Sequence, residues 1–271
     1  VIRKHLSYAK GGGLAAACPA EMLTLIISDV PGDDPAVIAS GPTVGDNSTA
    51  AEAYALMQKW HIPITPAMNV VLSGPRTTIL PEAPELSRVS NRIIVAPSQS
   101  LAAAQKLAEA KSWHVKLLGD ALEGEARELA ADHARLATSI QSTLTNTDVP
   151  VLLLSGGECT VTKQGGGIGG PNAEYALALA IALNGNQGIS AIACDTDGVD
   201  GAAEVAGAFV DGSTLKRAAA MGHNALRYLA TNDSHSFFEA LGDQVITGPT
   251  LTNVNDFRAI LIAGPDDPSC D

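Results

Sequence analysis

The chain has 271 residues, with 17 Lys and Arg against 29 Asp and Glu, so that its formal net charge is −12. A protein that neutralises nucleic-acid phosphates needs a basic stripe, and one that stacks bases needs aromatic side chains, which make up only 4% of this chain. We therefore exclude nucleic acid as a partner and expect a small polar metabolite. The length and the 46% hydrophobic content predict one or two globular domains.

The four cysteines are scattered along the chain and form no C-x-x-C pair. They are Cys18, Cys159, Cys194 and Cys270. This pattern is typical of reduced thiols in a cytoplasmic protein, not of a disulfide framework or a zinc site. No apolar run reaches the roughly 18 residues of a membrane helix, so we expect no membrane partner. The chain starts at Val1, without Met, and we expect residues before it in the protein.

Short apolar runs alternate with Ala-rich stretches of helical period. Strands are predicted at residues 23–28, 92–96, 114–118, 151–154, 160–163, 189–194, 244–247 and 258–263. Helices are predicted at residues 50–59, 101–111, 122–140, 173–183 and 236–241. Alternation of this kind predicts an α/β fold with mainly parallel sheets flanked by helices, since parallel strands need a crossover connection.

A proline-containing polar stretch, residues 74–89, separates one lone strand from the run of several. We therefore predict two Rossmann-like α/β domains, with a boundary after residue 75. Residues 1–75 would be the C-terminal remainder of an N-terminal α/β domain, because one strand cannot form a sheet. Residues 76–271 would form the second α/β domain.

The first candidate site follows the strand at residues 23–28, in the string SDVPGDDP. Ligands of open α/β sheets bind beyond the carboxyl ends of strands, where this string places Ser28, Asp29 and Asp33. Asx-turns or helix caps are the alternative role for each aspartate. Nearby, Arg3 and Lys10 concentrate positive charge that an anionic substrate would need, although they could equally form a solvated face.

The second candidate site is the glycine-rich string GGGIGGPN at residues 165–172, which leads into an apolar helix. Backbone N–H groups of such a loop can approach an anion at a helix N-terminus, so we predict a phosphate cradle here. The string also satisfies G-x-G-x-x-G, which leaves a dinucleotide site open. An exposed flexible hairpin is the structural alternative.

The third candidate site is the string DTDGVDG at residues 195–201, again at the end of an apolar strand. Mg²⁺ prefers oxygen ligands, and one or two carboxylates with substrate phosphates are its usual set. A turn held by Asx hydrogen bonds, without metal, is the alternative. A later polar loop, residues 248–256, could line the same cleft or only reverse the chain.

Together these strings resemble the glycerate 2-kinase family, the class II glycerate kinases with a MOFRL C-terminal domain, some of which are labelled hydroxypyruvate reductases. The matching strings are RKHLS with KGG (residues 3–7 and 10–12), SDVPGDDP (28–35), SGPT (40–43), SGGE (155–158), GG with Asn172 and Glu174, DTDGVDG (195–201), and Thr250 with TNVND (252–256). The resemblance implies transfer of phosphate from ATP, with Mg²⁺, to the 2-hydroxyl of D-glycerate, in a cleft between two α/β domains. It also implies that about the first third of the family's length precedes Val1.

The predicted roles follow from these strings. Asp29 or Asp33 would accept the hydroxyl proton as catalytic groups with Lys10, while Arg3, Lys10 and Ser28 would bind glycerate. Mg²⁺ would lie on Asp195, Asp197 and Asp200. Nucleotide and phosphate would contact Ser155, Gly156, Gly157, Glu158, Gly167, Gly169, Gly170, Asn172, Glu174, Thr250 and Asn253.

Two positions depart from the family pattern, because arginines common in the family are replaced by Gly13 and Pro171. Loss of a guanidinium beside phosphate removes charge stabilisation. Three questions stay open at this point. The enzyme could be an NAD(P)H-dependent hydroxypyruvate reductase that uses residues 165–170, the chain could be a non-catalytic fragment, and the assembly could be a homodimer.

Overall fold

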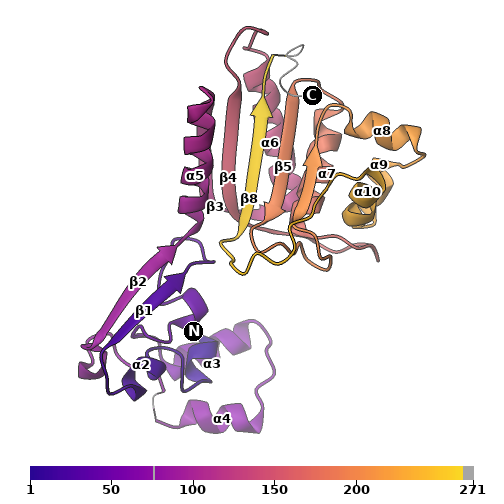
Figure 1. Ribbon diagram of the computed structural model, residues 1–271. Coiled ribbons are helices and arrows are strands. Elements are labelled where there is room, and N and C mark those ends of the chain that lie inside the picture. Colours follow the sequence, from indigo (N-terminus) through magenta and orange to yellow (C-terminus); the bar gives the residue numbers. More distant parts are fainter. Residues whose placement is uncertain (76, 265–271) are drawn as a thin grey trace. The chain divides into compact units, whose positions relative to one another are not determined.

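The computed structural model describes residues 1–75 and 77–264 (Figure 1). The chain divides into two compact units, Val1–Ala96 and Pro97–Asp271. This division falls later than the boundary expected after residue 75. The reason is that β2 (Val89–Val95) pairs in parallel with β1 (Met22–Ile27) and so belongs to the first unit.

The first unit combines the β1–β2 ladder with short helices. They are α1 (Ile2–His5), α2 (Gly13–Ala17), α3 (Ala50–Lys59), α4 (Pro66–Ser73) and the 3₁₀ turns η1 (Ile38–Ser40) and η2 (Pro84–Leu86). Helix α3 begins with a capping box, in which Thr49 and Glu52 each bond the other's backbone N–H. Ala53, Met57 and Leu72 form the buried cluster between α3 and α4.

One side of β1 is apolar and exposed. Leu23 and Leu25 keep 65% and 57% of their surface in contact with solvent, although they belong to a strand. Parallel sheets are normally covered on both faces and have more than two strands. That residues outside this chain complete this sheet stays a prediction.

The second unit is built on a six-stranded sheet in the order β3-β4-β8-β5-β6-β7 (Figure 1). The strands are β3 (His114–Glu125), β4 (Val151–Thr160), β5 (Ile189–Asp195), β6 (Gly207–Val210), β7 (Gln244–Val245) and β8 (Asp256–Ile262). The helices are α5 (Pro97–Ala110), α6 (Ala126–Gln141), α7 (Pro171–Leu183), α8 (Thr214–Ala220), α9 (Ala225–Ala230) and α10 (Ser234–Leu241).

The α/β fold class is confirmed, with strand pairing more mixed than expected. Strands β3, β4, β5 and β7 point in the same direction, whereas β6 and β8 run against them. Because β8 inserts between β4 and β5, only the β3–β4 ladder of this sheet is parallel. The insertion brings the start of β8 to the same end of the sheet as the end of β5.

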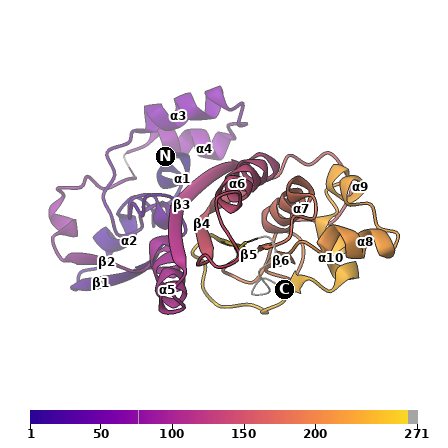
Figure 2. The same ribbon diagram turned by 90° about the horizontal axis from the view of Figure 1, so that it is seen from above.

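Helices cover the two faces of this sheet unequally (Figures 1 and 2). Helices α6 and α7 pack on one face in the main core, while α5 packs on the other face over β3 and β4. Helix α7 is rich in Ala and Leu, and each of residues 172–180 is buried. Its N-terminus therefore lies within the protein, near the strand ends.

Several elements differ from the sequence-based expectation. Helices α4, α8 and α9 and the strand β6 were not predicted, since each is short and lacks a long periodic pattern. A separate strand at residues 160–163 is wrong, because Thr160 is the last residue of β4, which pairs along β3, and residues 161–163 form no strand. In the described part of the chain, no helix is long and apolar enough to cross a membrane.

Candidate functional site

Polar residues gather where β5 ends and β8 begins. Asp195, the last residue of β5, pairs in register with Asp256, the first residue of β8, which also pairs with Gly157 of β4. Asp197 and Asn253 lie in the loops beyond these strand ends. We refer to Asp195, Asp197, Asn253 and Asp256 as the strand-end cluster.

Asp195 and Asp197 share one tight turn. The backbone N–H of Asp197 donates to Asp195 Oδ1 at 2.9 Å, and the N–H of Val199 donates to Asp197 Oδ1 at 2.7 Å. Burial and the nearby charges of Asp197 and Asp256 raise the pKa of Asp195 to about 7. A cation at this turn would relieve the repulsion among the carboxylates.

The donor set of this turn fits Mg²⁺. Within residues 1–75 and 77–264, no group of three or more His, Cys, Asp or Glu is arranged to hold a metal. Mg²⁺ does not require such a group, because it keeps waters and substrate phosphates beside one or two carboxylates. Asp195 and Asp197 supply two carboxylates, each only partly buried.

The loop at residues 248–256 folds onto the same turn. The Thr250 N–H donates to the Asp197 carbonyl at 3.0 Å, and its hydroxyl donates to the Thr196 carbonyl at 2.6 Å. The Asn253 side-chain amide donates to Asp197 Oδ2 at 3.3 Å. The predicted residues Thr250 and Asn253 thus lie beside the predicted metal ligand Asp197.

The SGGE string lies within β4 and not in a loop. Ser155, Gly156 and Gly157 are buried, while Glu158 is exposed. Gly157 has φ = 117°, and a Cβ there would lie 2.1 Å from the Leu122 carbonyl oxygen. The glycine therefore permits close approach of β3, and only Glu158 of this string is open to a ligand.

The glycine-rich string at residues 165–170 packs against the protein itself. A Cβ on Gly167 would lie 2.4 Å from Asp233 Cβ, and one on Gly169 would lie 2.7 Å from Ser234 Oγ. A Cβ on Gly170 would lie 2.3 Å from the Asp200 carbonyl oxygen. The N–H groups of this string also donate inward, those of Gly165 and Ile168 to Asn232 Oδ1 and Asp233 Oδ1 and that of Gly167 to the Thr231 carbonyl. Because these donors are already paired within the protein, the string does not form a cradle open to phosphate in this structure.

Asp200 occupies the anion position at the start of α7. Its carboxylate accepts the N–H of Asn172 at 2.9 Å and that of Ala173 at 2.8 Å. His235 Nε2 lies 3.3 Å from Asp200 Oδ2. Burial lowers the pKa of His235, but hydrogen bonds and the charge of Asp200 outweigh burial and raise it.

This arrangement corrects two predicted assignments. Asp200 is 1% exposed and caps a helix, so it is not placed to be a metal ligand. Asn172, which is fully buried, and Glu174 cannot meet a nucleotide directly. Glu174 Oε1 accepts from Arg127 Nε at 2.6 Å, and burial is the main reason why its pKa is raised.

Sequence reasoning missed a buried charge pair that includes Asp256 of the strand-end cluster. Arg258 is 1% exposed and forms an ion pair with Asp256, which is 4% exposed. The pair could have been predicted from the alternation of side chains along β8, which places Asp256 and Arg258 on the same buried face as Ile260 and Ile262. Such a pair in an otherwise apolar strand face indicates a specific role.

The first unit holds the remaining predicted residues. Ser28 is buried, Asp29 is exposed at the end of β1, and Asp33 adopts a left-handed φ of 53°. Lys10 Nζ donates to the Ala39 carbonyl at 2.9 Å, and Arg3 is exposed. No hydrogen bond or ion pair joins any two of these five residues, all of which lie in the described part of the chain.

The two departures from the family pattern have structural contexts. A Cβ at Gly13 would lie 1.9 Å from the Tyr8 carbonyl oxygen, so that this backbone admits no side chain there. Pro171 occupies the first turn of α7, where its missing N–H costs nothing.

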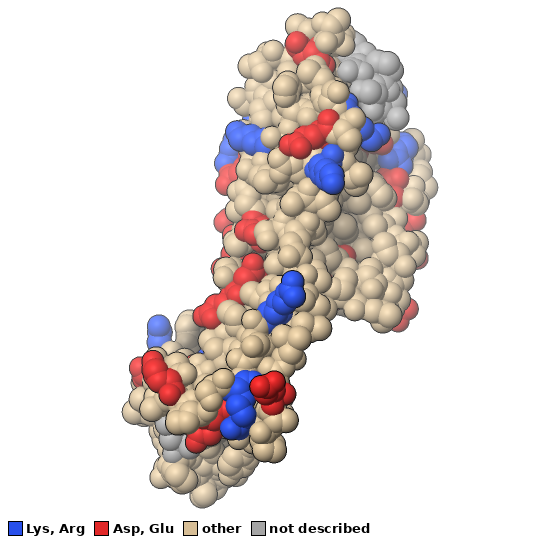
Figure 3. All heavy atoms as spheres, turned by 60° about the vertical axis from the view of Figure 1, so that its left-hand side comes forward, with Lys and Arg blue, Asp and Glu red and all other residues tan. Residues whose placement is uncertain are grey.

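Figure 3 shows basic side chains separated by acidic and uncharged ones on the visible part of the described surface.

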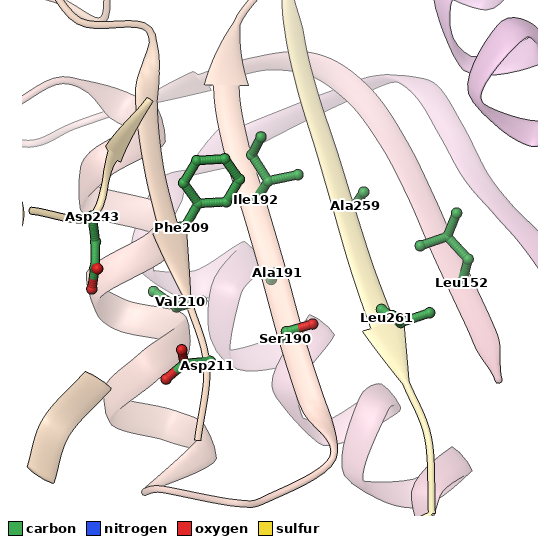
Figure 4. Close-up of a pocket in the computed structure, with 10 residues that line it drawn as sticks. All are labelled: Leu152, Ser190, Ala191, Ile192, Phe209, Val210, Asp211, Asp243, Ala259 and Leu261. Carbon is green, nitrogen blue, oxygen red and sulfur yellow. The ribbon is translucent and has the colours of Figure 1, made fainter. Parts of the chain in front are cut away.

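A separate cavity of about 290 Å³ lies on the face of the sheet that α5 leaves open (Figure 4). Phe209, Ile192 and Leu261 line it, with Asp211 and Asp243 at one side. It contains none of the predicted site residues. The strand-end cluster therefore remains the candidate site of this unit.

Two family models match the chain. The MOFRL family model matches residues 151–256, and the model described as "Domain of unknown function (DUF4147)" matches residues 1–73. The MOFRL match covers β4, α7, the strand-end turn of β5 and the loop before β8. Thus it contains the whole strand-end cluster.

Along almost its whole length, the chain is similar to proteins named hydroxypyruvate reductase and to proteins named glycerate kinase. A "Putative hydroxypyruvate reductase" of Agrobacterium vitis is 44% identical, with 96% of this chain and 68% of that protein aligned. The D-glycerate 2-kinase of Thermotoga maritima is 39% identical, with 96% and 61% aligned. The crystal structure of glycerate kinase from Thermotoga maritima superposes with a TM-score of 0.83 at 37% identity, over 97% of this chain and 62% of that one.

The chain spans only about 60% of the length of several of these relatives. The two family models nevertheless match residues 1–73 and 151–256, and the alignments to these relatives cover 96% of this chain. On this similarity of sequence and structure, the chain belongs to the glycerate 2-kinase family.

Proposed function

We propose that the protein containing this chain transfers the terminal phosphate of ATP, with Mg²⁺, to the 2-hydroxyl of D-glycerate. The observation that carries this proposal is the pair Asp195 and Asp197 on one turn at the open end of β5. Phosphoryl transfer depends on positioning and charge stabilisation, and carboxylate-held Mg²⁺ supplies much of both. The kinase-named relatives support the same reaction.

Residues of the strand-end cluster would act as a metal and phosphate platform. Asp195 and Asp197 would hold Mg²⁺, which when bound neutralises phosphate charge. Asn253 holds the Asp197 carboxylate in place, and the exposed Glu158 and Thr250 border the nucleotide in this proposal. In the first unit, Asp29 or Asp33 would accept the hydroxyl proton, while Arg3, Lys10 and Ser28 would bind the glycerate carboxylate.

The reductase alternative is disfavoured by the start of α7. A dinucleotide site of the G-x-G-x-x-G type needs the N–H groups of that helix for pyrophosphate. Here Asp200 accepts the N–H groups of Asn172 and Ala173, and the glycines pack against the turn before α10. A pyrophosphate would have to displace a buried carboxylate from its hydrogen bonds.

We also propose that the reaction takes place in the cytoplasm, and a homodimer is the assembly to test first.

The decisive assay supplies the full-length protein with D-glycerate, ATP and MgCl₂, and separately with hydroxypyruvate and NADPH or NADH. We expect ADP and 2-phosphoglycerate in the first mixture and no nicotinamide oxidation in the second. Nicotinamide oxidation without ATP turnover would refute the kinase proposal.

A further inference from the structure

Arg258 lies in the core of the second unit, directly next to the strand-end cluster. Its guanidinium forms the ion pair with Asp256, donates from Nη2 to Cys159 Sγ at 3.0 Å and reaches the Gly156 carbonyl from Nη1 at 3.4 Å. The guanidinium carbon also lies 5.3 Å from the centre of the Tyr175 ring. Burying a charge is costly unless it is paired and hydrogen-bonded, so these contacts mark a position with a specific purpose.

The contacts of Arg258 join three different elements. Asp256 belongs to β8, Gly156 and Cys159 belong to β4, and Tyr175 belongs to α7. Each of these elements carries part of the candidate site or borders it. A shift of the guanidinium would therefore move all three strand and helix ends together.

Asp256 extends the same network to the start of α7. Its Oδ1 accepts the side-chain amide of Asn172 at 2.6 Å, and its Oδ2 accepts the N–H of Cys159 at 3.2 Å. Asn172 in turn meets Asp200, the carboxylate that caps α7. The chain of hydrogen bonds thus runs from Arg258 to the turn that follows Asp195 and Asp197.

We propose that Arg258 is a positioning residue for phosphoryl transfer, which fixes the end of the sheet that presents Asp195 and Asp197. This inference rests on the proposed function and adds a residue that acts through others. Arginine suits the task because its planar fork donates in several fixed directions, whereas lysine carries a point charge with three rotatable donors. Misplacement of reacting groups by about 1 Å can lower a rate by about a hundredfold.

The test compares Arg258→Lys with Tyr175→Phe in the full-length protein. Arg258→Lys keeps the charge beside Asp256 but cannot also bond Gly156 and Cys159. Tyr175→Phe keeps the ring beside the guanidinium and removes only the hydroxyl, which lies 2.7 Å from His133 Nδ1. Both variants change the same core, but only Arg258→Lys removes the guanidinium hydrogen bonds that join β8 to β4.

For Arg258→Lys we expect kcat for glycerate phosphorylation to fall about tenfold or more, while KM for glycerate changes less than about twofold. Amide hydrogen exchange should speed up about tenfold in residues 155–159 and 172–174, and stay unchanged in residues 50–59 of the first unit. Tyr175→Phe should lower thermal stability without this loss of kcat. An unchanged kcat and exchange rate in Arg258→Lys, or an equal kcat loss in both variants, would overturn the proposal.

A second variant covers the case in which Arg258→Lys does not fold. Cys159→Ala removes one acceptor of the guanidinium and leaves the ion pair, so exchange in the same two segments should rise about twofold to fivefold. Exchange equal to that of the parent in this variant would contradict the proposed tie to β4. If the parent itself fails to phosphorylate glycerate, the proposed function is refuted, while the exchange comparison still decides whether Arg258 fixes the strand ends.

Discussion

Replacing Asp200 with alanine should destabilise the second unit by about 3 kcal/mol. The carboxylate accepts two backbone N–H groups at the start of α7, and each buried hydrogen bond to a charged group contributes about 1.5–3 kcal/mol when its partner is left unpaired. Because the contributions of two neighbouring hydrogen bonds do not add fully, we expect a total loss of about 3 kcal/mol, at the lower end of their sum. At about 2–4 °C for each kcal/mol, the melting temperature should fall by about 6–12 °C.

The assay is thermal unfolding followed by far-UV circular dichroism, without added nucleotide or metal. Asp200→Asn keeps one acceptor oxygen and should cost about half as much as alanine. Asp132→Asn is the matched control, because Asp132 is exposed and forms a surface ion pair with Arg135, so the melting temperature of this variant should stay within about 2 °C of the parent's. If Asp200→Ala melts like this control, Asp200 is not the cap of α7, and its role as a metal ligand returns.

Two further predictions concern packing and pH. Gly167→Ala should lower the free energy of unfolding by about 1–3 kcal/mol in urea titrations, because its Cβ would meet Asp233. Gly166→Ala is the control and should be nearly neutral, since nothing lies within 4 Å of its Cβ; equal effects of the two variants would contradict the packing of this loop. Burial and the charge of Arg258 lower the pKa of His133 from 6.5 to about 4, so the unfolded state binds the proton first. The contribution of His133 to stability should therefore fall by up to about 3 kcal/mol as pH drops from 6.5 to 4. In urea titrations at stepped pH, the difference in unfolding free energy between the parent and His133→Gln should change by that amount; a difference that stays constant with pH would refute the assignment.

Local signals carried much of the secondary structure. Residues 50–59 were predicted as a helix and form α3, because a capping box and a clean period mark its bounds. The residues of β6 gave no such signal, since four residues cannot show a period. The antiparallel insertion of β8 depends on pairing with strands about 70 and 100 residues earlier in the chain, which no local pattern encodes.

The candidate site divides in the same way. The DTDGVD string drew attention to three aspartates, and Asp195 and Asp197 lie together on one turn. Gly198, with φ = 93°, then reverses the chain and carries Asp200 to the start of α7, where its role changes from ligand to cap. Only the tertiary structure shows this separation, although the spacing of Asp256 and Arg258 could have indicated a buried pair.

In the proposed function, Asp195 and Asp197 hold the Mg²⁺ that glycerate phosphorylation needs. The most direct test measures the rate of glycerate phosphorylation by the full-length protein against Mg²⁺ concentration, for the parent and for Asp197→Asn. We expect the apparent dissociation constant for Mg²⁺ to rise at least about tenfold, since removing a hydrogen-bond partner of a metal ligand already lowers metal affinity by about that factor. The circular dichroism spectrum should stay unchanged. An unchanged Mg²⁺ dependence in Asp197→Asn would contradict the account.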